Sequence, residues 1–303
     1  MVRKHNRRAA KAAYAISLAV AIVIGLVAAS AGTAGGQPTV TIGTKNFTEQ
    51  YVLGQLYKQA LEAKGFKVNY DESVGSSEVI DAALTSGKIN FYPEYTGVIV
   101  LDIAHQTSPK TAAATYAAAK AFEEGRGFTL LNPTPFFDTD SFGLLTSTAK
   151  RYHLHTISDV KKVKKTLTYG GFPECRTRVT CFLGLQKVYG LKRLKFVPLG
   201  SVSIYTALDQ HKVTAGDVFS TDPQLLSKKY TVLKDTKHLF GFQNVAPVLS
   251  KDLAADPKLV QTVNAVSAKL TLNAMKQLNK AVAIDKNQPA DVAHAFLQAN
   301  GLL

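Results

Sequence analysis

The sequence predicts an α/β fold. Short apolar segments typical of strands recur along the chain, and segments with apolar residues at helical spacing lie between them. The composition, 46% hydrophobic and 19% charged, is typical of a globular protein. After the first 31 residues, the chain is long for one domain and has a comfortable length for two lobes.

Residues 1–31 have the layout of a secretory signal peptide. A basic start without acidic residues precedes an apolar run from Tyr14 to about Ala29, and small residues follow. An uncleaved membrane anchor is the alternative, because the run is long enough to span a bilayer if slightly extended. No cysteine follows the run, which argues against a lipid-modified amino terminus. We therefore expect an extracytoplasmic protein, periplasmic or at the cell surface.

The first half of the chain predicts three strand–helix units. Asn46, with Glu49 three residues later, resembles a capping box, and Gly65 and Gly87 are suited to end helices. Pro109 is expected at the first position of the third helix. The predicted strands cover 40–43, 66–70 and 89–92, and the predicted helices cover about 46–64, 76–86 and 108–124.

The second half continues the alternation. Pro133 and Pro135 interrupt the pattern before a fresh strand, which suggests that the chain passes there into a second set of units. The predicted strands cover 142–146, 166–169, 195–197, 213–219, 230–233 and 245–249, and the helices about 183–189, 257–278 and 289–300.

Polar and aromatic residues gather just after two of the predicted strands, in the segments 44–50 and 92–97. Open α/β sheets bind small molecules at the carboxyl ends of their strands. The chain has no nucleophile elbow, phosphate loop, dinucleotide glycine pattern or zinc-protease helix. His153 and His155 lack a third ligand nearby, so we interpret them as surface residues. The pattern favours binding over catalysis, with no metal and no cofactor.

The net charge is +14, and five of these charges precede Ala31, which leaves +9 for the rest. The densest cluster follows Val160 and has no interleaved aromatic residues, so nucleic-acid binding is not expected. A basic surface suits an acidic cell envelope or an anionic bilayer instead. The cluster consists of Lys161, Lys162, Lys164 and Lys165.

Cys175 and Cys181 are the two cysteines of the chain. An even count in an exported protein predicts a disulfide, with a free pair as the alternative. The bond would close a small loop around Arg178. Two cysteines fall short of the four ligands of a structural zinc site.

Five short segments, in this order along the chain, resemble the solute-binding proteins of ABC transporters for glycine betaine, choline and related quaternary amines. The resemblance implies a type II periplasmic-binding-protein fold with a ligand cleft between two lobes. It places 38–137 with 245–303 in lobe 1 and 138–244 in lobe 2, and it implies a monomer that serves an ABC permease. The segments are 45–50, 92–97, 173–191, 220–222 and 244–247.

Members of this family hold a trimethylammonium group in a box of tyrosines, because a fixed cation without hydrogen-bond donors is best desolvated against aromatic faces. By this resemblance, Tyr95 is the box tyrosine of lobe 1 and Phe219 occupies a second box position. Lys45 and Arg178 would meet the anionic end of the ligand.

Two box positions depart from the family pattern, since Asp140 and Gln243 stand where tyrosines are usual. Asp138 falls on a position that is often Asp or Asn, and Asp140 could attract the cation by its charge. These departures leave the ligand open between glycine betaine, choline and other quaternary amines or zwitterions. The remaining predicted ligand residues are Asn46, Thr221 and Asn244.

Simpler interpretations exist for the same residues. Tyr95 and Phe219 could be core residues, and Lys45 could merely lie beside the helix. Arg178 could form a local pair, and Asp140 could be solvated or cap a turn. At the level of function, the alternatives are an envelope enzyme on the same two-lobed fold or a ligand-sensing domain tethered by the amino-terminal segment.

Overall fold

The computed structural model describes residues 39–200 and 202–303. The predicted signal peptide or anchor, residues 1–31, lies outside the described residues. Among the described residues, no helix has both the length and the apolar character needed to cross a bilayer.

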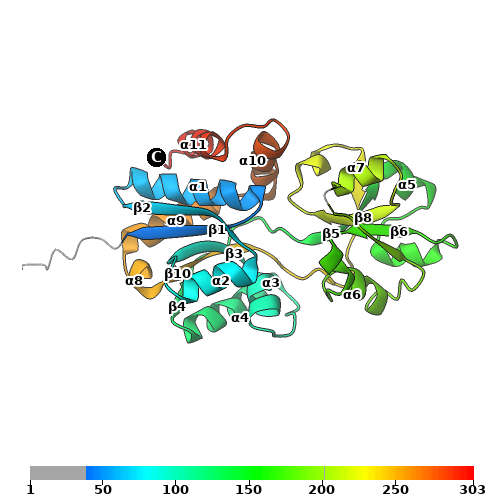
Figure 1. Cartoon of the computed structure of the whole chain (residues 1–303), viewed down its shortest axis with the longest axis horizontal. Helices are drawn as coiled ribbons and strands as arrows, with labels where there is room; N and C mark the ends of the chain where they lie inside the picture. Colours follow the sequence, from blue (N-terminus) through cyan, green and yellow to red (C-terminus); the bar gives the residue numbers. More distant parts are fainter. Residues whose placement is uncertain (1–38, 201) are drawn as a thin grey trace, which may run out of the picture. The chain divides into compact units, whose positions relative to one another are not determined.

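The first sheet has five strands in the order β2-β1-β3-β10-β4 (Figure 1). Strand β1 pairs in parallel with β2 and β3, whereas β10 pairs antiparallel with β3 and β4. The strand β10 follows β3 by about half the chain, yet it lies next to it in the sheet. The strands are β1 (Val40–Lys45), β2 (Val68–Gly75), β3 (Phe91–Tyr95), β4 (Phe128–Leu130) and β10 (Val245–Ser250).

Helices cover both faces of this sheet. Figure 1 shows α1 and α11 on one side and α2 and α4 on the other. Buried side chains of α1, α9, α10 and α11 form one core cluster, and those of α2 and its neighbours form another. The helices are α1 (Thr48–Ala63), α2 (Ser77–Thr85), α3 (Thr96–Val98), a π-helical turn η1 (Ile99–Ile103), α4 (Ala112–Gly125), α8 (Lys251–Ala254), α9 (Pro257–Lys269), α10 (Leu272–Ala283) and α11 (Pro289–Ala299).

The second sheet also has five strands, in the order β7-β6-β8-β5-β9. Strand β6 is parallel to β7 and β8, and β5 runs antiparallel to β8 and β9. The strands are β5 (Asp140–Leu145), β6 (Thr168–Gly171), β7 (Lys195–Pro198), β8 (Ala215–Phe219) and β9 (Tyr230–Val232). The helices are α5 (Thr146–Arg151), α6 (Phe182–Lys187) and α7 (Ile204–Asp209), with 3₁₀ turns η2 (Ile157–Lys162), η3 (Pro173–Arg176) and η4 (Pro223–Leu226).

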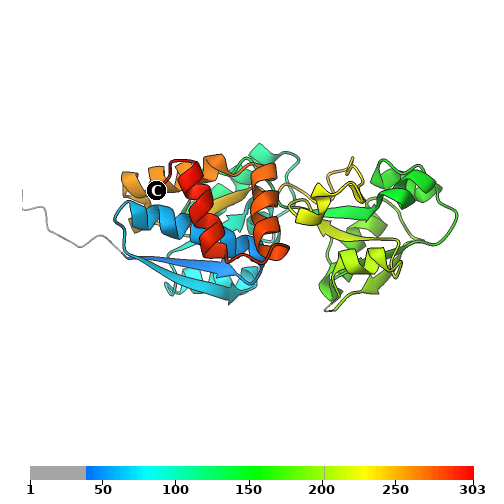
Figure 2. The ribbon, with the colours of Figure 1, turned by 90° about the horizontal axis from the view of Figure 1, so that it is seen from above.

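Two segments connect the sheets, and they pair with each other. Phe137 and Asn244 form an isolated antiparallel bridge, and the backbone N–H of Asp138 donates to the carbonyl of Gln243 at 3.0 Å. Neither connecting segment contains a helix (Figure 2). The two bridged residues lie at the carboxyl ends of their segments, just before β5 and β10.

Three predicted helix boundaries were wrong. Residues 257–278 form two helices, because Leu270 leaves the helical conformation (ψ 80°) and the Thr271 hydroxyl accepts from the N–H of Ala274 to start α10. The third helix starts at Ala112 behind a Thr111 cap, so Pro109 lies before it. Asn46 does not cap α1, whose N-cap is Phe47 without a side-chain bond.

Candidate functional site

The carboxyl ends of β1 and β3 bring Lys45 and Tyr95 together. The Lys45 ammonium lies 4.3 Å from the centroid of the Tyr95 ring, so this ring holds a cation over its face. The same ammonium lies 2.6 Å from Glu94 Oε1, and it also donates to the Ser77 hydroxyl at 3.2 Å. Lys45 is buried, with 5% of its surface exposed, and it is therefore committed to partners within the chain.

Phe47 is an aromatic neighbour that the sequence reasoning missed. Its ring stacks on Tyr95 at a centroid distance of 6.3 Å and an interplanar angle of 23°, and it stays 39% exposed. The Lys45 ammonium lies 5.8 Å from the Phe47 centroid as well. The signal available in the sequence was the position of this aromatic residue, between a strand end and the start of a helix.

Glu49 links the two sheets, although its position suggested only a helix cap. Its Oε1 accepts from the Tyr95 hydroxyl at 2.9 Å, and its Oε2 accepts from the Asn279 amide at 2.9 Å. The same amide donates to the carbonyl of Thr221 at 3.2 Å, in the loop after β8. Burial raises the pKa of the Glu49 carboxyl. Groups from three distant segments thus meet around one carboxyl.

A second carboxyl group lies beside this network. Asp138 Oδ1 accepts from the hydroxyl of Thr221 at 2.8 Å and from its N–H at 3.3 Å. Burial, followed by the charge of Glu49, raises the pKa of Asp138 well above its usual value. Asp222 accepts from the Tyr205 hydroxyl at 2.7 Å, and burial raises its pKa too. Asp222 was also missing from the predicted residues.

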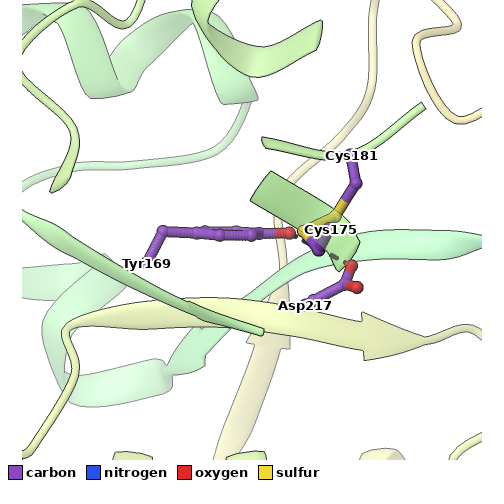
Figure 3. Close-up of a disulfide and its surroundings, with 4 residues drawn as sticks. All are labelled: Tyr169, Cys175, Cys181 and Asp217. Carbon is purple, nitrogen blue, oxygen red and sulfur yellow. Dashed lines mark hydrogen bonds between the residues drawn. A yellow bond between two sulfur atoms is a disulfide. The ribbon is translucent and has the colours of Figure 1, made fainter. Parts of the chain in front are cut away.

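Asp140 forms a pair with a residue that the sequence reasoning missed, Asp217. Asp140 lies opposite Phe219, and Asp217 lies opposite Phe142. The strands β5 and β8 therefore place the two aspartates on one face of the sheet, two residues apart in register. Burial and the neighbouring carboxyl raise the pKa of Asp217 well above its usual value, and burial raises that of Asp140 to about 6. The Tyr169 hydroxyl donates to Asp217 Oδ1 at 3.2 Å (Figure 3). Two carboxyls so close favour sharing one proton.

The predicted disulfide between Cys175 and Cys181 is confirmed. Figure 3 shows it beside the Asp217 carboxyl. These three residues also form the one group in the described chain with metal-ligand spacing, but both sulfurs are in the disulfide and so do not offer thiolates. Arg178 is exposed on the loop that the bond closes, and its charge lowers the pKa of Asp140 against the effect of burial.

The amides of Gln243 and Asn244 are held by the backbone around the connecting segments. Gln243 Oε1 accepts from the N–H of Val98 at 3.0 Å. The Gln243 side chain packs so closely on Gly97 that a Cβ on residue 97 would lie 2.6 Å from Gln243 Oε1. The Asn244 amide donates to the carbonyls of Thr134 and Phe136, each at 3.1 Å.

The other predicted residues differ in exposure. Thr221 is buried, Phe219 is half-buried at the end of β8, and Asn46 is exposed. Two cavities found in the described residues, of about 590 and 390 Å³, are lined by none of the predicted site residues. The ligand role of each predicted residue therefore stays a prediction.

Comparison with known proteins identifies the family. Residues 38–299 match the model of the OpuAC family, the substrate-binding domain of ABC-type glycine betaine transport systems. A glycine-betaine-binding protein of Pseudomonas aeruginosa is 31% identical over 277 residues, which cover 88% of this chain and 89% of that protein. The carnitine transport binding protein OpuCC of Listeria monocytogenes is 28% identical, covering 86% and 87% of the two chains.

Solved structures agree with this match. The crystal structure of a glycine betaine/carnitine/choline ABC transporter protein superposes with a TM-score of 0.78 at 25% identity, covering 87% of this chain and 99% of that one. Apo YehZ from Escherichia coli gives a TM-score of 0.71, also at 25% identity, covering 88% and 99%. The chain belongs to the OpuAC family of substrate-binding domains of ABC-type glycine betaine transport systems.

Proposed function

We propose that this protein captures a small solute with a fixed positive charge, a quaternary amine or a zwitterion that contains one, and delivers it to an ABC permease without chemical change. The observation that carries the proposal is the chain of contacts from Tyr95 through Glu49 and Asn279 to Thr221. It joins an aromatic face that already holds an ammonium to strand ends of both sheets. The named ligands of the relatives are of this class.

The two sheets support the proposed lobes. Residues 38–137 with 245–303 would form one lobe and residues 138–244 the other, since β10 returns to the first sheet and β5 to β9 form the second. The paired connecting segments at Phe137 and Asn244 are then the hinge. Hinge closure around a bound ligand is a common transition of two-lobed proteins.

The carboxyl groups around the site favour a cation, because a nearby positive charge favours their ionised form. Five carboxyls cluster there, while Lys45 is already paired with Glu94. A carboxylate attracts a cation more strongly as water leaves the site. The family resemblance implies that Arg178 meets the anionic end of a zwitterion. The carboxyls are Glu49, Asp138, Asp140, Asp217 and Asp222.

Binding of a permanently charged ligand should depend on pH through Asp140. Folding raises the pKa of this group from 3.8 to about 6, so the folded chain keeps a proton that the unfolded chain has lost. The stability of the ligand-free protein should therefore fall as the pH rises from about 4 to about 6. Over the same range choline affinity should rise, because the ionised carboxylate attracts the cation.

Titration calorimetry of choline between pH 5 and 8 checks this prediction. Choline has no titrating group in this range, so the change belongs to the protein. Asp140→Asn should remove the step near pH 6, whereas Asp209→Asn, at an exposed ion pair with Lys229, should keep it. A step that persists in Asp140→Asn would assign the titration to another group.

Reducing the disulfide should weaken ligand binding more than it lowers stability. The loop between Cys175 and Cys181 is short, so the bond adds little chain-entropy stabilisation. It holds Arg178 and borders Asp217, so its loss loosens both. Calorimetry with and without reductant measures the effect, and the double variant Cys175→Ala with Cys181→Ala should not respond to reductant. Equal affinity of the reduced and oxidised protein would contradict the prediction.

A thermal-shift screen over glycine betaine, choline, carnitine, proline betaine and ergothioneine tests the proposed function. A solute that binds only the folded state adds about 2.7 kcal/mol of stability at a hundred times its dissociation constant. We expect at least one of these solutes to do so and to be recovered unchanged by mass spectrometry. No shift with any of them, or chemical turnover, would contradict the proposal.

Amino-terminal sequencing of the exported protein decides between a cleaved signal peptide and an anchor.

A further inference from the structure

The lysine cluster that the proposed function does not use forms part of a larger basic surface. Two segments, 160–167 and 187–195, carry eight basic residues and not one Asp or Glu. They lie in the part of the chain that forms the second sheet, before β6 and between α6 and β7. We call this surface the basic pocket. Its basic residues are Lys161, Lys162, Lys164, Lys165, Lys187, Lys192, Arg193 and Lys195.

The basic pocket is concave and has an apolar floor. The two segments enclose a cavity of about 390 Å³. The basic side chains at its rim are exposed, whereas the apolar side chains that line it are buried. A flat patch of solvated lysines would have neither feature. The rim consists of Lys161, Lys165, Lys192 and Arg193, and the floor of Val160, Val163, Leu167, Leu191 and Leu194.

Arg193 fixes the two segments to each other. Its guanidinium donates to the carbonyls of Lys161 and Lys164, each at 3.3 Å, and to that of Val163 at 3.1 Å. Gly190 has a positive φ of 64°, and a Cβ there would lie 3.2 Å from the end of the Lys161 side chain. Arg193 thus holds the two segments together by hydrogen bonds, and Gly190 leaves room for the Lys161 side chain at the rim.

The rim lysines have no acidic partner in the described chain. Lys162 pairs with Asp159 at 2.6 Å, but no ion pair involves Lys161, Lys165 or Lys192 among residues 39–200 and 202–303. Three ammonium groups without an acidic partner, those of Lys161, Lys165 and Lys192, therefore surround one cavity. Such an arrangement favours an anion with several oxygen acceptors.

We propose that the basic pocket binds the phosphate headgroups of an anionic lipid bilayer. Clusters of four to eight basic residues are attracted to such surfaces, roughly 1 kcal/mol for each residue near the membrane. Among the described residues, no aromatic side chain lines the cavity for stacking a nucleotide base. The inference concerns a surface apart from the ligand site and does not depend on which solute is carried.

Sedimentation of the exported protein with vesicles tests the proposal. Vesicles of phosphatidylglycerol and phosphatidylcholine should bind the protein, and vesicles of phosphatidylcholine alone should not. The triple variant Lys161→Gln, Lys165→Gln and Lys192→Gln should bind on the order of 100-fold more weakly, about fivefold for each lysine. The matched control changes Lys212, Lys251 and Lys269 to Gln, three exposed lysines without an ion pair in the described chain, and should retain most of the affinity. Equal losses in the two triple variants would overturn the proposal.

A second measurement needs no variant. Anionic vesicles should protect Lys161, Lys165 and Lys192 from acetylation, as mapped by mass spectrometry, while Lys251 and Lys269 stay reactive. Equal protection by millimolar inorganic phosphate would assign the pocket to a soluble phosphate and overturn the lipid assignment. Protection by a DNA duplex but not by vesicles would overturn it in favour of nucleic acid.

Discussion

Replacing Lys45 with methionine is expected to destabilise the protein by about 3–5 kcal/mol, because it leaves the Glu94 carboxylate buried without its counter-charge. Glu94 is fully buried and Lys45 is 5% exposed, and their charged atoms lie 2.6 Å apart. The second carboxylate oxygen of Glu94 has no hydrogen-bond partner in the described chain, so the lysine is its main compensation. Burial raises the pKa of Glu94 even with Lys45 in place. Urea unfolding at pH 7.5 measures the loss.

The double variant Lys45→Met with Glu94→Gln is the control. It removes both charges and keeps an oxygen that accepts the N–H of Tyr95, which now bonds to Glu94 Oε1 at 2.6 Å. Most of the lost stability should return, since replacing a buried ion pair by neutral groups is often tolerated. If Lys45→Met alone has no effect on unfolding, the pair does not stabilise the fold, and Lys45 is free to meet the ligand as the family resemblance implies.

Tyr95→Ala is expected to cost on the order of 1–2 kcal/mol of affinity for a quaternary amine, whereas Tyr95→Phe should keep most of it, because the ring face supplies the attraction. The contact with Glu49 adds a second expectation. Loss of the hydroxyl removes a hydrogen bond to a buried carboxyl, so Tyr95→Phe should lower the free energy of unfolding by about 1.5–3 kcal/mol. Calorimetry and urea unfolding on the same samples separate the two effects.

Tyr57→Phe is the matched control for this pair of variants. Tyr57 is fully buried in the core of the first sheet, and its hydroxyl pairs with that of Ser267 at 2.9 Å. Its loss should lower stability without changing affinity. If neither Tyr95→Ala nor Tyr95→Phe changes the affinity for a quaternary amine by a measurable amount, Tyr95 does not line the cation site.

Much of the fold could be predicted from the sequence, because strands buried by helices leave clear apolar segments. The predicted strands at 40–43, 195–197 and 245–249 lie within β1, β7 and β10. The break between α9 and α10 could not be predicted, since Leu270 and Thr271 continue the apolar and polar spacing of a helix. The assignment of β10 to the first sheet followed from family resemblance, because periodicity carries no information on strand order.

Without the family resemblance, the residue pattern indicated the site only where polar residues follow a strand end. Lys45 and Tyr95 follow such ends, and they do meet. Glu49 and Asn279 are 230 residues apart in the sequence, so nothing local indicates their contact. Asp217 lies inside an apolar strand, so the sequence pattern did not mark it as a site residue. Gln243 was assigned by its place in the family pattern, but its amide oxygen is held by the backbone of Val98.

The most direct test of a site for a fixed positive charge compares a cation with its neutral copy. Choline and 3,3-dimethylbutan-1-ol have nearly the same shape, but a carbon replaces the charged nitrogen in the second. If aromatic faces and carboxylates recognise the charge, calorimetry should find choline, or another quaternary amine from the screen, bound on the order of 100-fold more tightly than its neutral isostere. Equal affinity for choline and its neutral isostere would show that the site recognises shape and apolar surface alone. That result would contradict the proposed function.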